Sequence, residues 1–286
     1  MLSEMGVSPT VLFRGRTLFS RLGSEGVKTR AFVRAHIHDT CYTRRLLGGA
    51  ERVPYVNVTD LSVALAREVR RGDARLIYVY IEATDTIIYV YIEATDTIAH
   101  LYGYGTEEQE ADLENTLRVI LGRLAGLGPE LGGDVGLVIA SDHGLLTMEP
   151  EGVVYLDKRT RLKRYLLRDE NGVPLVSGSP RNAYLHVKEG YVDRVVRIVE
   201  DVLGDRAWIL TRDELVKRRL LGRVSGRVAR RVGDVIVLPD EGTSAWIEHF
   251  AGRRVRGRGF HGGLSRVEME VPLLPMRLSE LRPATS

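Results

Sequence analysis

The stretch Ser141-Asp142-His143-Gly144 follows the apolar run Asp134-Val-Gly-Leu-Val-Ile-Ala140, and the fold can be inferred outward from it. A short apolar run bounded by polar residues and glycine predicts a buried strand. This strand would end at an adjacent carboxylate and imidazole, two side chains that bind metals. Open α/β sheets build their sites at the carboxyl ends of their strands. We therefore expect a site at Asp142 and His143.

Two other segments carry side chains of the same kind. Asp96 and His100 follow another apolar, strand-like segment, and His261 lies in Gly259-Phe-His-Gly-Gly263. Each is weak alone, because Asp-x-x-x-His pairs arise by chance and glycines mostly mark turns. Together they offer mixed Asp and His ligands, which suit zinc or a similar first-row ion. Three protein ligands with an open position are typical of a catalytic metal.

The order of elements predicts a doubly wound α/β sheet flanked by helices. Residues 17–26 favour a helix closed by glycine and 27–37 a strand, and residues 57–71 have the apolar spacing of an amphipathic helix. A capping-box pattern at Thr106-Glu-Glu-Gln109 opens a helix that runs to about Leu127, before the strand that leads to Asp142. Strands alternating with helices indicate this fold class.

The pattern changes between about residues 147 and 232. Short strands such as 183–187 alternate with helices such as 191–203 and 211–221, which predicts an α+β cap insertion over 147–232. We expect the α/β core to comprise residues 1–146 and 233–286, with Val235–Pro239 as a strand that rejoins it.

Residues 77–87, Ile-Tyr-Val-Tyr-Ile-Glu-Ala-Thr-Asp-Thr-Ile, are repeated letter for letter as residues 88–98. Each copy favours a strand ending in a turn. One perfect doubling indicates a recent duplication, an engineered insertion or a sequence error rather than an architectural repeat. Only the second copy continues into His100, so we expect it to hold the strand position, with the extra residues forming a loop or an edge strand.

Composition bounds the class of protein. The chain has 286 residues, 44% hydrophobic and 28% charged, with a formal net charge of +3. Cys41 is the only cysteine, which excludes an internal disulfide and a cysteine zinc site and agrees with a cytoplasmic location. No apolar run approaches the roughly 20 residues of a membrane span, so no membrane partner is expected.

Two features outside these motifs invite a functional interpretation. The basic run from Lys217 to Arg231 favours a solvated helix face, with contact to an anionic substrate or partner as the alternative. His36 and His38 alternate on one strand face, but Thr40 and Cys41 do not supply the further ligands at the spacing a metal site needs. We expect two partly exposed histidines there.

The motifs Asp96-Thr-Ile-Ala-His100, Ser141–Gly144 and Gly259–Leu264, with Glu268 and Pro272 beyond, resemble the alkaline phosphatase superfamily, in particular its type I phosphodiesterase/nucleotide pyrophosphatase family. The resemblance covers about residues 15–275, with the motifs in the family's order. It implies two divalent ions, expected to be zinc, at the carboxyl edge of an alkaline-phosphatase-like sheet. Asp96, His100 and His261 would hold one ion. Asp142 and His143 would hold the other, with an aspartate and a Thr or Ser nucleophile from the family's N-terminal region.

The sequence departs from the family at its start. The region of resemblance begins after the position of the second-site aspartate and of the nucleophile, so we expect the nucleophile upstream of Met1 and the first core strand to be missing. Thr10, Thr17 and Ser20 lie near the start, and none has the family's nucleophile context. The catalytic nucleophile is therefore unassigned.

The resemblance implies a metal-dependent phosphoric ester hydrolase of the phosphodiesterase/nucleotide pyrophosphatase type, acting in its intact form on a small phosphate ester or nucleotide. Two alternatives remain at this stage: a phosphomonoesterase or phosphomutase of the same superfamily, and a non-catalytic remnant that binds an anion or nucleic acid. A net charge of only +3 favours an anionic ligand weakly and does not demand nucleic acid, so nucleic acid is not the expected partner. The sequence indicates no oligomeric state.

Overall fold

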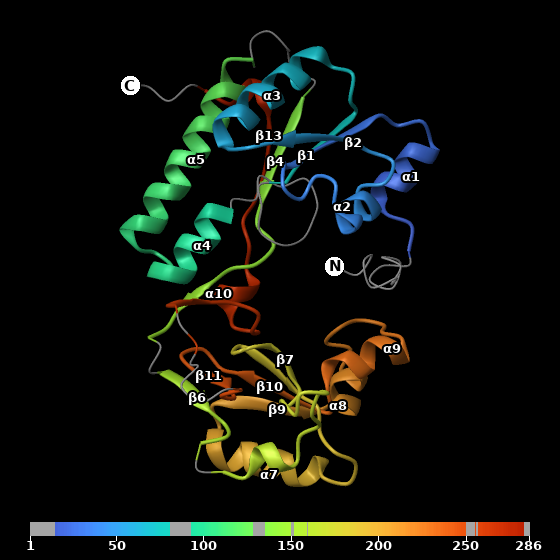
Figure 1. Ribbon diagram of the computed structural model, residues 1–286. Helices are drawn as coiled ribbons and strands as arrows, with labels where there is room; N and C mark the ends of the chain where they lie inside the picture. The colour runs from blue at the N-terminus through green and yellow to red at the C-terminus, as the bar shows by residue number, and fades with distance from the viewer. Residues whose placement is uncertain are drawn as a thin grey trace. The chain divides into compact units, whose positions relative to one another are not determined.

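The computed structural model describes residues 15–80, 93–127, 135–149, 152–158, 160–249, 255 and 257–282 (Figure 1). The chain divides into two compact units, each built from separate stretches of sequence. The first unit comprises Met1–Ile98, Glu107–Asp142 and Val271–Ser286. The second comprises Ala99–Thr106 and His143–Glu270.

The first unit contains a parallel sheet with β1 (Thr29–Arg34) at its centre, between β2 (Glu51–Tyr55) and β3 (Leu76–Val79). Parallel neighbours need a crossover, usually helical. Here α2 (Cys41–Leu46) follows β1, and α3 (Val58–Arg71) follows β2. The predicted mixed α/β architecture is confirmed. The expected loss of a first core strand stays a prediction.

Both faces of this sheet are covered, because successive side chains of a strand point to opposite sides. Phe32 of β1 packs in a cluster with residues of α3 and of α5 (Glu107–Ala125). Its neighbours Ala31 and Val33 pack in a second cluster with Phe19 of α1 (Leu18–Ser24). Helices on both faces of a parallel sheet make a doubly wound arrangement. The first cluster contains Phe32, Tyr55, Leu61, Leu65, Ala66, Val79, Ile120, Leu124, Leu127 and Leu278.

The two long helices of the first unit form where the sequence predicts them, the first from its apolar spacing and the second from its capping-box pattern. Asn57 caps α3 with a capping box: its side chain accepts from the backbone of Asp60, and the Asp60 carboxylate accepts from the backbone of Asn57. Helix α5 buries Ile120 and Leu124, whereas Leu113 is 37% exposed near the helix start.

The strand that leads to Asp142 is present but is less buried than predicted. β4 (Gly136–Ala140) pairs antiparallel with β13 (Leu273–Arg277). Val138 is 38% exposed, and Ala140 is the one buried residue of the strand. Among the described strands, β4 pairs only with β13. A strand with one neighbour has less of its surface covered than a strand at the centre of a sheet.

The repeated segment behaves differently from the prediction. The first copy supplies β3, so the expectation that the second copy holds this strand is wrong. Only four residues, Gly72 to Arg75, separate α3 from β3, so the first copy is the first segment able to reach β1. In the second copy Glu93–Ile98 is helical rather than a turn, while residues 81–92 lie outside the described part of the chain.

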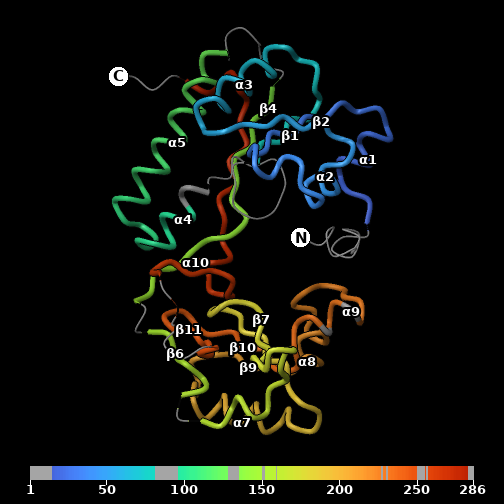
Figure 2. The backbone as a smooth tube through the Cα atoms, in the orientation of Figure 1, coloured from blue at the N-terminus to red at the C-terminus, as the bar shows by residue number. Residues whose placement is uncertain are grey.

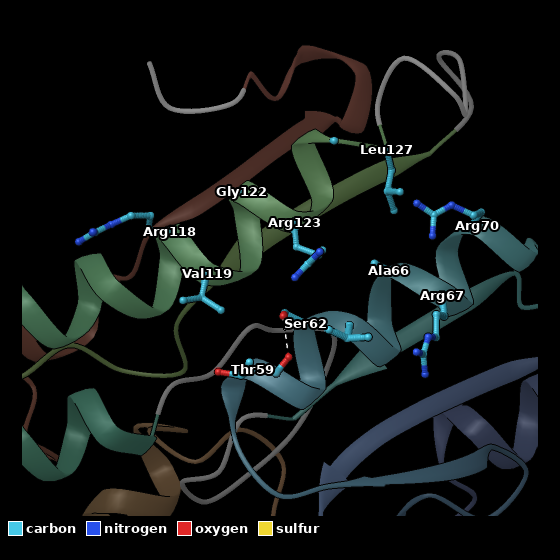
Figure 3. Close-up of a pocket in the computed structure, with 12 residues that line it drawn as sticks. Thr59, Ser62, Ala66, Arg67, Arg70, Arg118, Val119, Gly122, Arg123 and Leu127 are labelled. Atoms are coloured by element: carbon cyan, nitrogen blue, oxygen red, sulfur yellow. Dashed lines mark hydrogen bonds between the residues drawn. The ribbon is translucent and has the colours of Figure 1, made fainter. Parts of the chain in front are cut away.

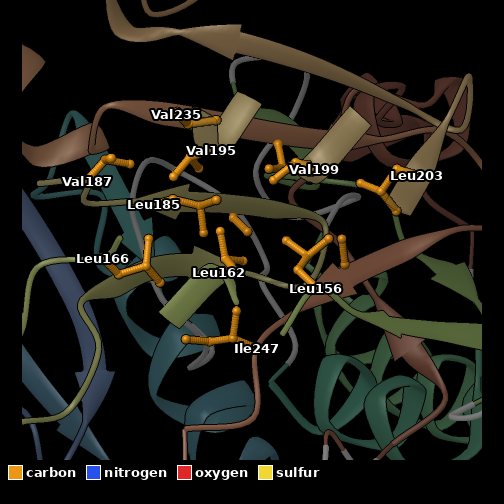
Figure 4. Close-up of a cluster of buried hydrophobic side chains, with 13 residues drawn as sticks. Leu156, Leu162, Leu166, Leu185, Val187, Val195, Val199, Leu203, Val235 and Ile247 are labelled. Atoms are coloured by element: carbon orange, nitrogen blue, oxygen red, sulfur yellow. The ribbon is translucent and has the colours of Figure 1, made fainter. Parts of the chain in front are cut away.

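The second unit is organised around an antiparallel sheet in the order β7 (Val176–Ser179), β8 (Asn182–Leu185), β10 (Val235–Pro239) and β9 (Ala207–Thr211). Helix α7 (Val192–Leu203) lies along this sheet in Figure 2 and packs its apolar side into the cluster of Figure 4. The sequence predicted residues 235–239 as a strand that rejoins the α/β core, and in the structure this strand, β10, pairs with β8 and β9. Every residue of β10 is buried, so its apolar character does not reveal which sheet it joins.

Shorter elements complete the second unit. The first pair is β5 (Leu146–Thr147) with β12 (Gly259–Phe260), antiparallel, and the second is β6 (Val153–Tyr155) with β11 (Ser244–Trp246), parallel. The helices α8 (Arg212–Lys217), α9 (Gly226–Ala229) and α10 (Arg266–Met269) are short. The predicted cap boundaries at residues 147 and 232 stay a prediction. Within the described residues, no helix has the length and apolar character to cross a membrane.

Candidate metal centre

Asp96 and His100 lie on one face of α4 (Glu93–Tyr102), because residues four apart on a helix project in the same direction. The sequence predicted them after a strand, whereas both are helical. The helix is continuous, with its residues from Ala99 onward in the second unit. Asp96 is therefore held one turn before His100 by the helix itself.

Hydrogen bonds fix the end of α4 to two strands of the second unit. The Arg258 amide, just before β12, donates to the His100 carbonyl at 2.8 Å. The Tyr104 amide donates to Thr147 Oγ1 of β5 at 2.6 Å, and this hydroxyl donates to the Tyr104 carbonyl at 3.1 Å. The helix end and the two strands therefore form one local framework.

The pairing of β5 with β12 brings the remaining histidines together. Phe260 lies opposite Leu146, so His261 follows β12 close to the segment that connects His143 to β5. The rings of His143 and His261 stack with centroids 3.7 Å apart and planes inclined by 6°. The His100 ring lies 5.1 Å from that of His261. Three histidines predicted from separate motifs thus lie side by side in the second unit.

Backbone carbonyls orient two of these rings. His100 Nδ1 lies 2.7 Å from the Gly259 carbonyl oxygen, and His143 Nδ1 lies 2.9 Å from the Gly144 carbonyl oxygen. A carbonyl only accepts, so Nδ1 donates in each ring and Nε2 is the nitrogen left to face a metal. This arrangement is usual for histidines that bind metals, since the bond at one nitrogen sets the tautomer and aims the other.

His143 and His261 are both half-buried, and each offers a ring nitrogen to a possible metal-binding group. Imidazole nitrogens are donors that fit zinc. The stacked pair joins His143, predicted for one ion, to His261, predicted for the other. Ions in two-metal sites are about 3.5–4 Å apart, so ligands of both ions can share one cluster. Asp142 lies in the exposed bend directly before His143.

The histidines of the strand end in the first unit lie in other surroundings. His36 is exposed, and His38 is half-buried with its Nε2 3.4 Å from the Arg52 carbonyl oxygen. Neither belongs to a possible metal cluster among the described residues. The prediction of two partly exposed histidines is confirmed for this segment.

A buried ion pair that the sequence did not reveal supports the His261 loop. Arg181 is fully buried and donates to both carboxylate oxygens of Glu268, at 3.0 and 2.6 Å. Glu268 also accepts from the Gly263 amide at 2.8 Å and from Ser265 Oγ at 2.6 Å. Burial alone would raise the pKa of Glu268, but the bonds from Arg181, Ser265 and Gly263 outweigh it and the pKa is lowered.

Close packing explains the glycines of this loop. A Cβ at Gly259 would lie 2.2 Å from the Ala99 carbonyl oxygen of α4. A Cβ at Gly263 would lie 2.7 Å from a Glu268 carboxylate oxygen and 2.8 Å from Arg181. Gly263 was therefore only an indirect sequence signal for the Arg181–Glu268 ion pair, because a glycine indicates that another group lies close without identifying that group.

Solved structures of known proteins resemble this fold. Murine ectonucleotide pyrophosphatase/phosphodiesterase 5 is 18% identical, with a TM-score of 0.68 over 96% of this chain and 67% of that one. Its inactive variant in complex with AMP is 19% identical, with a TM-score of 0.65 over the same shares of the two chains. Phosphonoacetate hydrolase from Sinorhizobium meliloti in complex with phosphonoformate is 18% identical, with a TM-score of 0.54 over 93% of this chain and 71% of that one. At these identities the likeness concerns the fold.

The family model for type I phosphodiesterase/nucleotide pyrophosphatase matches residues 55–264. No curated protein matches the chain. The matched range contains all five predicted site residues, from Asp96 to His261, and covers most of the chain. The chain therefore belongs to the type I phosphodiesterase/nucleotide pyrophosphatase family, within the alkaline phosphatase superfamily.

Proposed function

We propose that this protein is a metal-dependent hydrolase of phosphodiester or pyrophosphate bonds in nucleotides or related small phosphate esters, with zinc as the bound ion. The cluster of His100, His143 and His261 carries the proposal, because three motifs distant in sequence converge there with metal-type donors. The AMP bound by the murine relative supports a nucleotide as the substrate class.

The proposed ligand roles follow the motifs. Asp96, His100 and His261 hold one ion, and Asp142 with His143 contributes to the second. In these roles His100 and His143 bind the ion through Nε2, because Nδ1 of each ring is hydrogen-bonded to a backbone carbonyl. Such ions supply neutralisation of the phosphate oxygens and activation of a nucleophile. No residue of this chain is assigned as that nucleophile, so metal binding and turnover need separate measurements.

Metal content after dialysis against zinc, measured by mass spectrometry, tests the site. The wild-type chain should retain zinc in stoichiometric amount, and His261→Ala should lose most of it. His38→Ala is the matched control, because His38 is also a half-buried histidine but lies in the first unit. Equal zinc retention by His261→Ala and wild type would refute the proposed centre.

Turnover is measured on an activated phosphodiester and on the corresponding monoester. Zinc-dependent hydrolysis that prefers the diester and disappears in His261→Ala supports the phosphodiesterase proposal. Preference for the monoester would instead favour a phosphomonoesterase. Zinc binding without turnover of either ester would restrict this chain to a binding role.

A further inference from the structure

A groove lies between α3 and α5, wholly within the first unit and formed by residues outside the metal centre (Figure 3). Its volume is about 610 Å³. Small-molecule sites usually occupy roughly 300–1,000 Å³, so the groove has the size for a compact organic ligand. It is lined by Thr59, Ser62, Val63, Ala66, Arg67, Arg70, Arg118, Val119, Gly122, Arg123, Gly126 and Leu127.

The lining is strongly basic. It contains four arginines, two from each helix, and no acidic side chain. Arg118 pairs with Glu114 at 3.2 Å in an exposed contact. Among the residues that the structure describes, neither Arg67 nor Arg123 forms an ion pair. Several guanidinium groups around one concavity create a positive potential that attracts anions.

The ends of the helices explain part of this charge. Arg70 lies in the last turn of α3 and Arg123 in the last turn of α5, where cations stabilise the negative end of the helix dipole. That effect falls off within the last turn, so it does not explain Arg67 and Arg118. Figure 3 shows Arg123 reaching from α5 toward Ser62 and Thr59, across the groove rather than along its own helix.

The floor of the groove is mixed in character. Thr59 and Ser62 supply hydroxyl groups, and the half-buried Val63 and Val119 supply apolar side chains, one from each helix. Guanidinium groups bind phosphate oxygens through paired hydrogen bonds, whereas apolar side chains favour an uncharged organic body. A phosphoryl group attached to a small apolar or aromatic body satisfies both parts of the lining.

We propose that this groove is a second ligand site, which binds a small organic phosphate such as a mononucleotide independently of the metal centre. Arg67 and Arg123 contact the phosphoryl group, and Val63 and Val119 contact the organic body. The proposal does not depend on the hydrolase function, because none of the five metal-type residues lines the groove.

Calorimetric titration of the full chain with AMP and with inorganic pyrophosphate tests the site, in the presence of a metal chelator. Wild type should bind AMP more tightly than pyrophosphate. Arg67→Gln/Arg123→Gln should weaken AMP binding by at least about tenfold, since each removes a charge-assisted hydrogen bond. Arg194→Gln/Arg197→Gln, on an exposed part of α7, removes the same charge elsewhere and should leave binding within about twofold.

A second pair of variants tests the groove without changing charge. A Cβ at Gly122 meets nothing within 4 Å, so Gly122→Ala should retain binding while Gly122→Phe fills the groove and abolishes it. The chelator keeps the metal centre empty throughout, so AMP binding under these conditions separates this proposal from the metal centre. Absence of AMP binding, equal loss in the α7 control, or tight binding of an RNA or acidic peptide without AMP binding would each overturn it.

Discussion

The loop that contains His261 depends most directly on one side chain, the carboxylate of Glu268. It receives four hydrogen bonds, two from Arg181 and one each from Gly263 and Ser265, and is 2% exposed. Two residues along, Glu270 makes an exposed pair with Arg266 at 2.7 Å. The two glutamates therefore both pair with an arginine but differ in burial and in their number of hydrogen bonds, and they make a useful pair for mutation.

We expect Glu268→Gln to lower the free energy of unfolding by about 3–5 kcal/mol, because it leaves the buried Arg181 charge without its counterion. Glu270→Gln should cost at most about 1 kcal/mol, as is usual for exposed pairs. Urea unfolding of both variants measures the difference. Equal costs would show that the buried pair gives no special support.

The Glu268 pair should also make stability depend on pH. Its pKa is lowered in the folded protein, so the unfolded chain binds the proton more readily. The stabilisation is present above the unfolded pKa of about 4.3 and is lost as the pH falls through the lowered folded value. The gap in unfolding free energy between wild type and Glu268→Gln should therefore narrow below about pH 4. A gap that stays constant to pH 2 would contradict this.

At the residue scale, the sequence predicted the histidines better than their supports. His100, His143 and His261 belong to short motifs with recognisable chemistry, and the structure brings them together. Arg181 lies in a turn after β7 and reaches Glu268 across 87 residues of sequence. No local pattern encodes such a contact, because it depends on how distant segments pack.

At the scale of elements, the site depends on the close approach of α4 to β12. A Cβ at position 259 would overlap the Ala99 carbonyl oxygen at 2.2 Å, and the Gly259 carbonyl orients His100. Gly259→Ala should therefore separate the helix from the strand and weaken zinc binding by about 10–100-fold, the usual cost of losing a ligand's orienting partner.

Zinc titration with a fluorescent competitor measures this change. Gly136→Ala is a suitable control, because the added Cβ would meet nothing within 4 Å and residue 136 lies in β4 of the first unit. Unchanged zinc affinity in Gly259→Ala would show that the approach of α4 to β12 does not set the geometry of the centre.

Elements with strong local signals were predicted well, and those set by competition between segments were not. Helix α3 has its cap, apolar face and closing glycine in one continuous stretch. The two copies of the repeated segment have identical local signals, so only the short connection from α3 to β3 decides which copy joins the sheet. Likewise β10 is apolar throughout, and its pairing with β8 and β9 is decided by partners far away in sequence.

At the scale of the whole molecule, the two tryptophans of the chain report on one unit. Trp208 lies in β9 and Trp246 in β11, both in the second unit. The histidines of the candidate centre come from three segments of this same unit. A bound ion would therefore stabilise the unit that tryptophan fluorescence observes.

Zinc should raise the thermal midpoint followed by tryptophan fluorescence. A ligand at a hundred times its dissociation constant stabilises the folded state by about 2.7 kcal/mol. Adding a chelator should reverse the shift, and His261→Ala should show none. An identical shift in His261→Ala would mean that zinc acts at another place in the chain.

The hydrogen bond between His100 and Gly259 spans 159 residues of sequence. A ribosome therefore synthesises more than half of the chain between the two partners, at about 5–20 residues per second. During those seconds His100 is already part of the chain, but the carbonyl that selects its tautomer does not yet exist. The metal centre can reach its final geometry only once Gly259 and His261 have been added, so zinc arriving earlier meets ligands that are not yet in place.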